Sequence, residues 1–300
     1  MPEICEVLLT TQYLSKIIGK YITNIKILGG RYLKKNISGL DKLSFPLKII
    51  SIQSHGKFLW MTLNDNNNVT WYMMNTFGLT GKWSYEKIEH SNVKFVIKKN
   101  KSSEKKIPVY FCDMRNFGTI SFTNSETILH NKLDKLAVDM LQNDISKKDF
   151  KKLIKNYKNK KKKIVIVLMN QNKNDGIISG LGNYLVPEIL YRSKISPHRT
   201  LNDLSDEDMD ILYKTIKYVL KLCYITNETE YISHMKKFLH SHTKNVGCGV
   251  FPDYIHEVKI GNDKFQFMVY RKKLDPLGNK VIGEKIITGR TTYWCPIVQS

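Results

Sequence analysis

The sequence predicts a mixed α+β fold in which strands and helices occupy separate stretches of the chain. Residues 21–122 contain short runs rich in β-branched and aromatic residues, residues 123–240 show helical periodicity, and the rest returns to glycine and short strands. A chain of 300 residues is long enough for two domains that each bury a core, with a small appendage. We therefore expect a β-sandwich domain over 1–124, a helical domain over 125–242, and a connecting segment with a terminal β-hairpin over 243–300.

The first domain is predicted to begin with a helix and continue as a two-layer β-sandwich. Residues 3–19 place Val7, Leu14 and Ile17 on one helical stripe, and Gly19 ends the pattern. The polar run 64–68 reads as the turn of a hairpin. The predicted strands are 22–28, 47–53, 58–63, 69–73, 93–97, 108–112 and 118–122.

The second domain is predicted to be helical, and the chain then ends in a small hairpin. Ser205 and Asp208 form a capping box at the start of one helix, whose apolar face includes Leu212, Ile216 and Cys223. The predicted helices are 132–141, 146–157, 163–171, 182–193, 205–225 and 231–240. The terminal segment is predicted to hold a strand at 265–270, a turn at 275–278 and a hairpin with Gly289 at its tip.

The charge of the chain indicates a polyanionic partner. Lysine and arginine number 48 against 27 acids, a net charge of +21, which is typical of proteins that bind nucleic acid or an anionic membrane surface. Part of this excess is what an AT-rich genome encodes, so a single lysine carries little information. No segment has the length and hydropathy of a membrane span, and the N-terminus carries acids where a secretory signal would be basic. We therefore expect a soluble intracellular protein and no membrane partner.

The N-terminus offers an unusual nucleophile. Removal of Met1 would expose the secondary amine of Pro2, and a chain-terminal amine has a pKa of about 7.7 to 8.0, against about 10.4 for lysine. A secondary amine that adds to a sugar aldehyde carbon and loses water gives an iminium ion, which weakens neighbouring C–H and C–O bonds. Glu3 stands beside it as a proton donor and acceptor. The ordinary alternative is that proline is simply a common second residue.

Three further segments carry groups suited to phosphate. Lys57 lies at a predicted strand-to-strand turn, and Asn183 lies near the start of a helix whose N-terminal amides would point at an anion. Arg290 lies at the tip of the terminal hairpin, and a guanidinium suits bidentate phosphate contact. Singly, each has an ordinary explanation as a solvated turn residue or a helix boundary. Their joint occurrence in this order favours a functional reading.

These four segments, in this order, resemble the formamidopyrimidine-DNA glycosylase and endonuclease VIII family of base-excision repair enzymes. The resemblance runs from Pro2 to about residue 299. It implies that Pro2 attacks C1′ of a damaged nucleotide and that Glu3 handles protons at the opening sugar. It also implies that Lys57 serves catalysis and grips, with Asn183 and Arg290, the phosphates that flank the lesion.

The resemblance extends to two loops and to a residue of the lesion pocket. The segments 77–81 and 113–118 are similar to loops from which the family inserts side chains into the void left by an extruded base. Leu79, Arg115 and Phe117 would be those side chains, offsetting the stacking lost on extrusion. For Leu79 and Phe117 the alternative is ordinary core packing. Glu6 matches a position in the family's lesion pocket.

The terminal segment departs from the family pattern, since most members close with a four-cysteine zinc finger. After Cys248, Cys295 is the only cysteine of the chain, Val298 stands where its near partner would be, and the turn 275–278 has none. A structural zinc ion needs four ligands, so we expect a metal-free finger. In this respect the chain resembles the zincless-finger, Nei-like branch found in vertebrates and giant DNA viruses. Three histidines are predicted to face DNA or solvent and not a metal: His240, His242 and His256.

The resemblance implies a bifunctional DNA glycosylase and AP lyase that works by β,δ-elimination, with no metal or nucleotide cofactor. It implies oxidised pyrimidines as substrates, and oxidised purines remain an alternative. The expected partner is damaged DNA, double-stranded and also single-stranded, bound by a monomer. Two alternatives from other classes are a non-catalytic damaged-DNA-binding protein of the same fold and an RNA-binding protein.

Overall fold

The computed structural model describes residues 1–226, 230–235, 238 and 257–300. The chain divides into two compact units, one formed by Met1–Asp134 with Glu228–His240 and the other by Lys135–Asn227 with Ser241–Ser300. In this division the chain separates after residue 134, and the terminal segment shares a unit with the helices.

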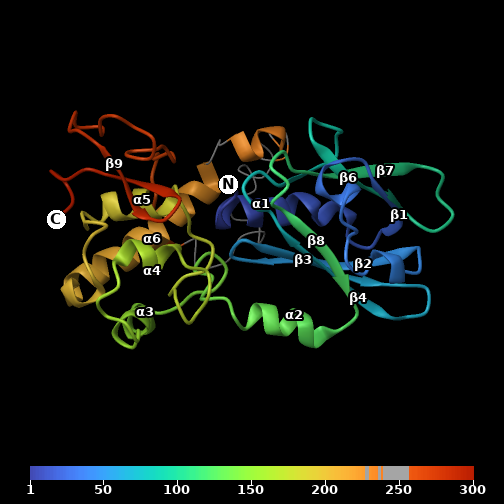
Figure 1. Ribbon diagram of the computed structural model, residues 1–300, viewed down its shortest axis with the longest axis horizontal. Helices are drawn as coiled ribbons and strands as arrows, with labels where there is room; N and C mark the ends of the chain where they lie inside the picture. The colour runs from blue at the N-terminus through green and yellow to red at the C-terminus, as the bar shows by residue number, and fades with distance from the viewer. Residues whose placement is uncertain (227–229, 236–237, 239–256) are drawn as a thin grey trace. The chain divides into compact units, whose positions relative to one another are not determined.

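The first unit contains one long N-terminal helix, the whole main sheet and a second helix (Figure 1). The helices are α1 (Ile4–Leu14) and α2 (Glu126–Leu133), with shorter 3-10 turns at Ser15–Ile17, Gly30–Leu33, Leu40–Lys42 and Glu230–Met235. The strands are β1 (Tyr21–Ile27), β2 (Leu47–His55), β3 (Phe58–Asn64), β4 (Thr70–Thr76), β5 (Lys82–Ser84), β6 (Ser91–Lys98), β7 (Lys106–Cys112) and β8 (Thr119–Thr123).

The sheet forms the two layers that the sequence predicts, with eight strands where seven were predicted. Their order is β5-β7-β6-β1-β2-β3-β4-β8, and β1 pairs with β2 only through Tyr21↔Lys48 and Ile22↔Leu47. The sheet folds at this short pairing, so the two halves face one another across the core. Trp83 of β5 donates from Nε1 to Oδ1 of Asn75 on β4 at 3.0 Å, which joins the two layers. The predicted α+β class with an N-terminal β-sandwich is confirmed.

Helix α1 is shorter than the predicted 3–19, because the chain tightens into a 3-10 turn after Leu14. Every residue of α1 except Gln12 is buried. Its two threonines satisfy their hydroxyls locally, since Thr10 and Thr11 donate to the carbonyls of Glu6 (2.7 Å) and Val7 (2.9 Å). The helix is therefore a core element, in contact with β2 and β3.

The second unit is built from helices and a terminal hairpin. The helices are α3 (Lys147–Lys155), α4 (Ile164–Met169), α5 (Leu185–Arg192) and α6 (Asp206–Thr226), and the hairpin is β9 (Ile282–Ile287) with β10 (Arg290–Trp294). The hairpin forms as predicted, with Gly289 at its tip in the left-handed region (φ 73°). Of the helix predicted over 231–240, the described part is a 3-10 turn, and most of the rest lies outside the described residues.

Two predictions of local structure are wrong. The helix predicted at 132–141 lies instead at 126–133, and the chain beyond it is extended, bridging through Leu136↔Asn172 and Val138↔Ile178. The strand predicted at 265–270 does not form. The backbone N–H groups of Met268, Val269 and Tyr270 instead donate hydrogen bonds to one carboxylate, that of Glu188 on α5.

Within the described residues, no helix combines the length and hydropathy needed to cross a membrane.

Candidate functional site

The first two predicted catalytic residues lie at the buried start of α1. Pro2 is buried, and because Met1 precedes it, its nitrogen is part of an amide. Glu3 is fully buried and forms a reciprocal capping box with Glu6. The Glu3 carboxylate accepts the Glu6 N–H, and Oε2 of Glu6 accepts the Glu3 N–H at 2.9 Å. The positive end of the helix dipole favours both carboxylates here, so Glu3 is held in a defined orientation directly beside Pro2.

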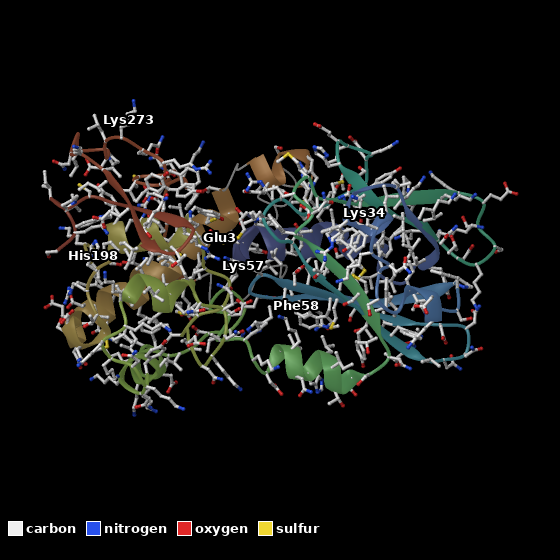
Figure 2. All side chains as sticks on the ribbon, in the orientation of Figure 1. Glu3, Lys34, Lys57, Phe58, His198 and Lys273 are labelled. Atoms are coloured by element: carbon white, nitrogen blue, oxygen red, sulfur yellow. The ribbon has the colours of Figure 1, made fainter. Side chains whose placement is uncertain are left out.

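Lys57 lies in the tight turn between β2 and β3. His55 pairs with Phe58, so Gly56 and Lys57 form the turn, and Gly56 adopts the left-handed φ of 56° that such turns require. The turn keeps the lysine at the end of the hairpin, where its side chain is half-buried. In the view of Figure 2, Glu3 and Lys57 are drawn next to each other, and α1 contacts both strands of this hairpin.

The residues predicted to fill a base void lie on two loops of the first unit. Leu79 follows β4 and is half-buried, whereas Arg115 and Phe117 lie between β7 and β8 and are exposed. The Phe117 side chain is 59% exposed, which excludes core packing for this residue. Met114, which is not among the predicted site residues, is also exposed, at 54%. A large apolar residue between Asp113 and Arg115 in the same loop was the signal that could have identified it.

Asn183 belongs to the second unit and precedes α5, whose N-cap is Tyr184. The turn before it is held by Gln171, which accepts the Gly180 N–H at 2.6 Å and donates to the Leu181 carbonyl at 2.9 Å. The Oδ1 atom of Asn183 is buried, and it has no hydrogen-bond partner within the described part of the chain. This oxygen can accept a hydrogen bond but cannot donate one to a phosphate.

Arg290 also belongs to the second unit, as the first residue of β10. Its side chain is exposed, and Nη1 lies 3.9 Å from Sδ of Met169 at the end of α4. The sulfur is a weak acceptor, so the guanidinium keeps most of its donors available. Of the two predicted phosphate ligands of this unit, Arg290 thus carries donors that the protein leaves largely unused.

Side chains hold the turn of the terminal segment where a zinc finger would place cysteines. Oδ1 of Asp275 accepts the N–H groups of Leu277 (2.9 Å) and Asn279 (2.8 Å), and Oδ2 accepts the Tyr191 hydroxyl at 3.1 Å. Burial acts to raise the pKa of Asp275, but the hydrogen bonds from Asn279, Tyr191 and Leu277 outweigh it and the pKa is lowered. Burial, with the Asp275 carboxylate beside it, raises the pKa of Tyr191 to about 12.

The predicted lone cysteine is part of an apolar cluster. Cys295 is fully buried against Tyr191, Val269 and Val281. Its N–H donates to Oε1 of Gln299 at 2.8 Å, and Gln299 in turn donates to the Ile195 carbonyl at 2.9 Å. In the part of the chain that the structure describes, no group of three or more His, Cys, Asp or Glu side chains is arranged to hold a metal ion. The predictions for His240, His242 and His256 lie outside the described residues.

Solved structures share this fold over its whole length. A Lactococcus lactis FPG mutant in complex with DNA containing Fapy-dG superposes with a TM-score of 0.72, at 20% identity and full coverage of both chains. MutM (FPG) from Thermus thermophilus also reaches 0.72, at 21% identity over 99% of this chain and 98% of that one. A third structure, wild-type Lactococcus lactis FPG with DNA that contains an oxidised pyrimidine, gives 0.71 at 20% identity. At these identities the likeness establishes the fold.

Sequence relatives extend along the same length. The formamidopyrimidine-DNA glycosylase of Ureaplasma parvum serovar 3 is 27% identical over 312 aligned positions that cover all of both chains. That of Mycoplasma mobile is 28% identical over 87% of this chain and 95% of its own. These relatives are bacterial and carry the formamidopyrimidine name, so the Nei-like branch stays a prediction.

Three family models match successive parts of the sequence. The formamidopyrimidine-DNA glycosylase N-terminal domain matches residues 1–120, the H2TH domain of the same enzymes matches 136–233, and their C-terminal domain matches 256–300. Together they account for most of the sequence in the family's own order, and the chain belongs to the formamidopyrimidine-DNA glycosylase family.

Proposed function

We propose that this DNA-repair glycosylase removes oxidised bases through the amine of Pro2 and then cleaves the abasic strand as an AP lyase. The observation that carries the proposal is the buried start of α1, where the capping box with Glu6 fixes the Glu3 carboxylate beside Pro2. A nucleophile and a proton-transfer group in fixed register are what the reaction needs. Lys57 lies in the turn between β2 and β3, and both of these strands contact the same helix.

The reaction begins once Met1 is removed and the Pro2 nitrogen becomes a free secondary amine. That amine attacks C1′, a C1′–N bond forms to Pro2, and the bond to the damaged base breaks, the base taking the electron pair and the proton that the amine nitrogen loses. Glu3 protonates the ring oxygen as the sugar opens, which leaves an iminium ion at C1′. The iminium acidifies the C2′ hydrogen, whose loss expels the 3′ phosphate, and a second elimination expels the 5′ phosphate.

Lys57, Asn183 and Arg290 are proposed to hold the phosphates around the lesion. Two features support this role: the fixed turn at Gly56, which carries Lys57, and the exposed guanidinium of Arg290. Contacts of this kind position the strand and carry no sequence information, which suits an enzyme that must act at any site of damage.

Oxidised pyrimidines are the proposed substrates, on the strength of the likeness to the zincless Nei-like branch. The rival is oxidised purines, favoured by the name that the curated relatives carry. Matched duplexes that contain thymine glycol, 5-hydroxyuracil or a formamidopyrimidine separate the two under single-turnover conditions. Faster excision of the formamidopyrimidine would reverse the proposed preference.

Borohydride trapping on an abasic duplex tests the chemistry. Protein whose mass shows loss of Met1 is expected to give a covalent adduct with the DNA, because borohydride reduces the iminium to a stable amine. The same protein with two residues left in front of Pro2 is expected to fold normally and to give no covalent adduct, because the Pro2 nitrogen is then part of an amide. If the processed protein gives no adduct, the lyase proposal fails and the non-catalytic DNA-binding alternative gains support. Equal binding to RNA of the same length would favour the RNA-binding alternative.

A further inference from the structure

The two loops proposed to fill the base void are joined by a single hydroxyl group. The Thr80 hydroxyl donates to Oδ1 of Asp113 and accepts the N–H of Arg115 at 3.0 Å. Thr80 lies next to Leu79 on one loop, and Arg115 is itself one of the proposed void-filling residues of the other. A movement of either loop would therefore break bonds to its neighbour.

The backbones of the two loops also touch directly. Gly78 adopts a left-handed φ of 59°, and a Cβ atom built on it would lie 2.6 Å from the Gly118 nitrogen and 2.6 Å from the Phe117 carbonyl carbon. No side chain fits between the loops there. Asp113 closes its own loop from inside, since Oδ2 accepts the Gly118 N–H at 2.7 Å and the residue is buried.

A third segment, the 3-10 turn Gly30–Leu33, also contacts the loop 113–118 and holds it through Arg31. Asn116 is left-handed (φ 58°), and its Oδ1 accepts the N–H of Arg31 at 3.0 Å and Nδ2 of Asn92 at 3.1 Å. Nη1 of Arg31 donates to the carbonyls of Asn116 (3.3 Å) and Gly118 (3.4 Å). The guanidinium is thus committed to loop backbone.

These contacts divide the loop into a fixed backbone and an outward-facing set of side chains. The braces reach the backbone at Arg115, Asn116 and Gly118, whereas the side chains of Met114 and Phe117 stay more than half exposed. A rigid backbone that presents apolar side chains to solvent gains nothing in folding stability from that exposure. It does suit insertion into a base stack, where ordering the loop beforehand removes an entropic cost from the binding step.

We propose that Thr80, Arg31 and Asn116 are positioning residues that lock loops 77–81 and 113–118 into one rigid wedge. Leu79, Arg115 and Phe117 then enter the void of an extruded base together and not one after another. The inference rests on the proposed base-excision function, because a wedge has a role only where a base leaves the duplex. None of the three positioning residues needs to touch the reacting atoms.

The test compares Thr80→Val with Thr70→Val, two substitutions that remove one hydroxyl and keep the side-chain shape. The Thr70 hydroxyl bonds Oδ1 of Asn64 at 3.2 Å, away from both loops, which makes it the matched control. Two substrates are used: a duplex with an oxidised base, which requires extrusion, and a single strand with an abasic site, which does not. Thr80→Val is expected to slow excision from the duplex about tenfold, as for loss of one or two net hydrogen bonds, and to leave abasic single-strand cleavage within about twofold.

A double-substitution cycle with Phe117→Ala shows whether Thr80 acts through the wedge. If it positions Phe117, then Thr80→Val costs little once the phenyl ring is gone, and the two effects are not additive. Full additivity would overturn the inference. So would equal rates for Thr80→Val and Thr70→Val on the duplex, or an equal loss for Thr80→Val on both substrates, which would mark a general structural defect.

Hydrogen exchange of the free protein tests the contacts between the two loops without DNA. Its result therefore does not depend on the proposed function. Thr80→Val is expected to speed exchange of the Arg115 and Gly118 amides and to leave α1 unchanged, whereas Thr70→Val alters neither loop. A wild type without activity on either substrate would sink the proposed function. Unchanged exchange at both amides would instead show that the hydroxyl does not hold the loops together.

Discussion

Glu3 combines two tasks that are usually assigned to different residues, since it caps α1 and stands beside the proposed nucleophile. The capping box with Glu6 needs only an acceptor at each side chain, and glutamine would supply one. Proton transfer at the sugar needs an ionisable group, which glutamine lacks. The two tasks can therefore be separated by an isosteric change.

We expect Glu3→Gln to lower excision by at least about a hundredfold, the usual contribution of a positioned acid or base, while the fold stays intact. The lost attraction between the carboxylate and the helix dipole should cost only about 0.3–1 kcal/mol of unfolding free energy. Thermal unfolding and single-turnover excision measured on one preparation decide the point. Near-normal excision would leave Glu3 with the capping role alone.

At the scale of elements, Glu188 fastens the terminal segment to α5. The N–H groups of Met268, Val269 and Tyr270 all donate to its carboxylate, at 2.8, 3.1 and 2.9 Å. Burial raises the pKa of Glu188, although these three donors and Arg192 act against it. A buried carboxylate is retained here because it gathers three backbone donors that no strand partner satisfies.

Glu188→Gln is expected to loosen this attachment. The substitution replaces one carboxylate oxygen by an NH2 group, which cannot accept a hydrogen bond from a backbone N–H. The penalty of an unsatisfied buried donor is about 1–3 kcal/mol. Thermal unfolding should show that loss, and DNA binding should weaken with it, since Arg290 lies on the hairpin of this segment. Glu207→Gln, at an exposed position in the first turn of α6, is the control. Equal unfolding temperatures for the two variants would contradict the fastening role.

The turn that holds Asp275 should make part of the stability depend on pH. Its pKa is lowered in the folded protein, so its contribution is fully present above the unfolded value of about 3.9 and is lost as the pH falls through the folded pKa. Asp275→Asn should therefore lower the unfolding temperature at pH 7, with a gap to wild type that narrows toward pH 2. A chelator should change neither protein. Loss of wild-type stability on chelation would show that a metal ion holds the finger.

The sequence predicted best those elements that are long enough to show several repeats of an apolar-polar pattern. Strands of five to nine residues with alternating burial, such as Leu47–His55, were placed to within a few residues. Strand β5 was missed because three residues are too few to show alternation. Helix α2 was misplaced because Leu129 is its only buried residue, so the apolar residues just beyond it gave the stronger helical signal.

The residues of the candidate site also differ in how well a local sequence pattern predicts their positions. Lys57 was placed correctly at its turn because Gly56 marks that turn locally, whereas Arg290, predicted at the hairpin tip, lies directly after Gly289 as the first residue of β10. The capping box at Glu3 was missed, since its first residue is a glutamate where Ser or Thr is usual. The brace between Arg31 and Asn116 joins residues 85 positions apart, and no local pattern reports such a contact.

For the whole molecule, the count of 48 lysines and arginines overstates the number of cations available to DNA. In the second unit Lys147, Lys151 and Lys155 pair with Asp206 and Asp210, at distances from 2.6 to 3.6 Å. Such pairs contribute little to stability where they are exposed, but they neutralise cations that would otherwise face a polyanion. The salt dependence of DNA binding should therefore report a limited set of phosphate contacts and not the full number of basic side chains.

The slope of log K against log salt counts those contacts, because each neutralised phosphate releases about 0.9 of a counterion. Lys57→Ala and Arg290→Ala should each reduce the magnitude of the slope by about one unit on a duplex with a stable abasic analogue. Lys99→Ala removes an equal charge at an exposed position, and Lys151→Ala removes one already paired with Asp210. Neither should change the slope appreciably. If Lys99→Ala matched Lys57→Ala, binding would follow total charge, and the turn lysine would have no special place at the phosphates.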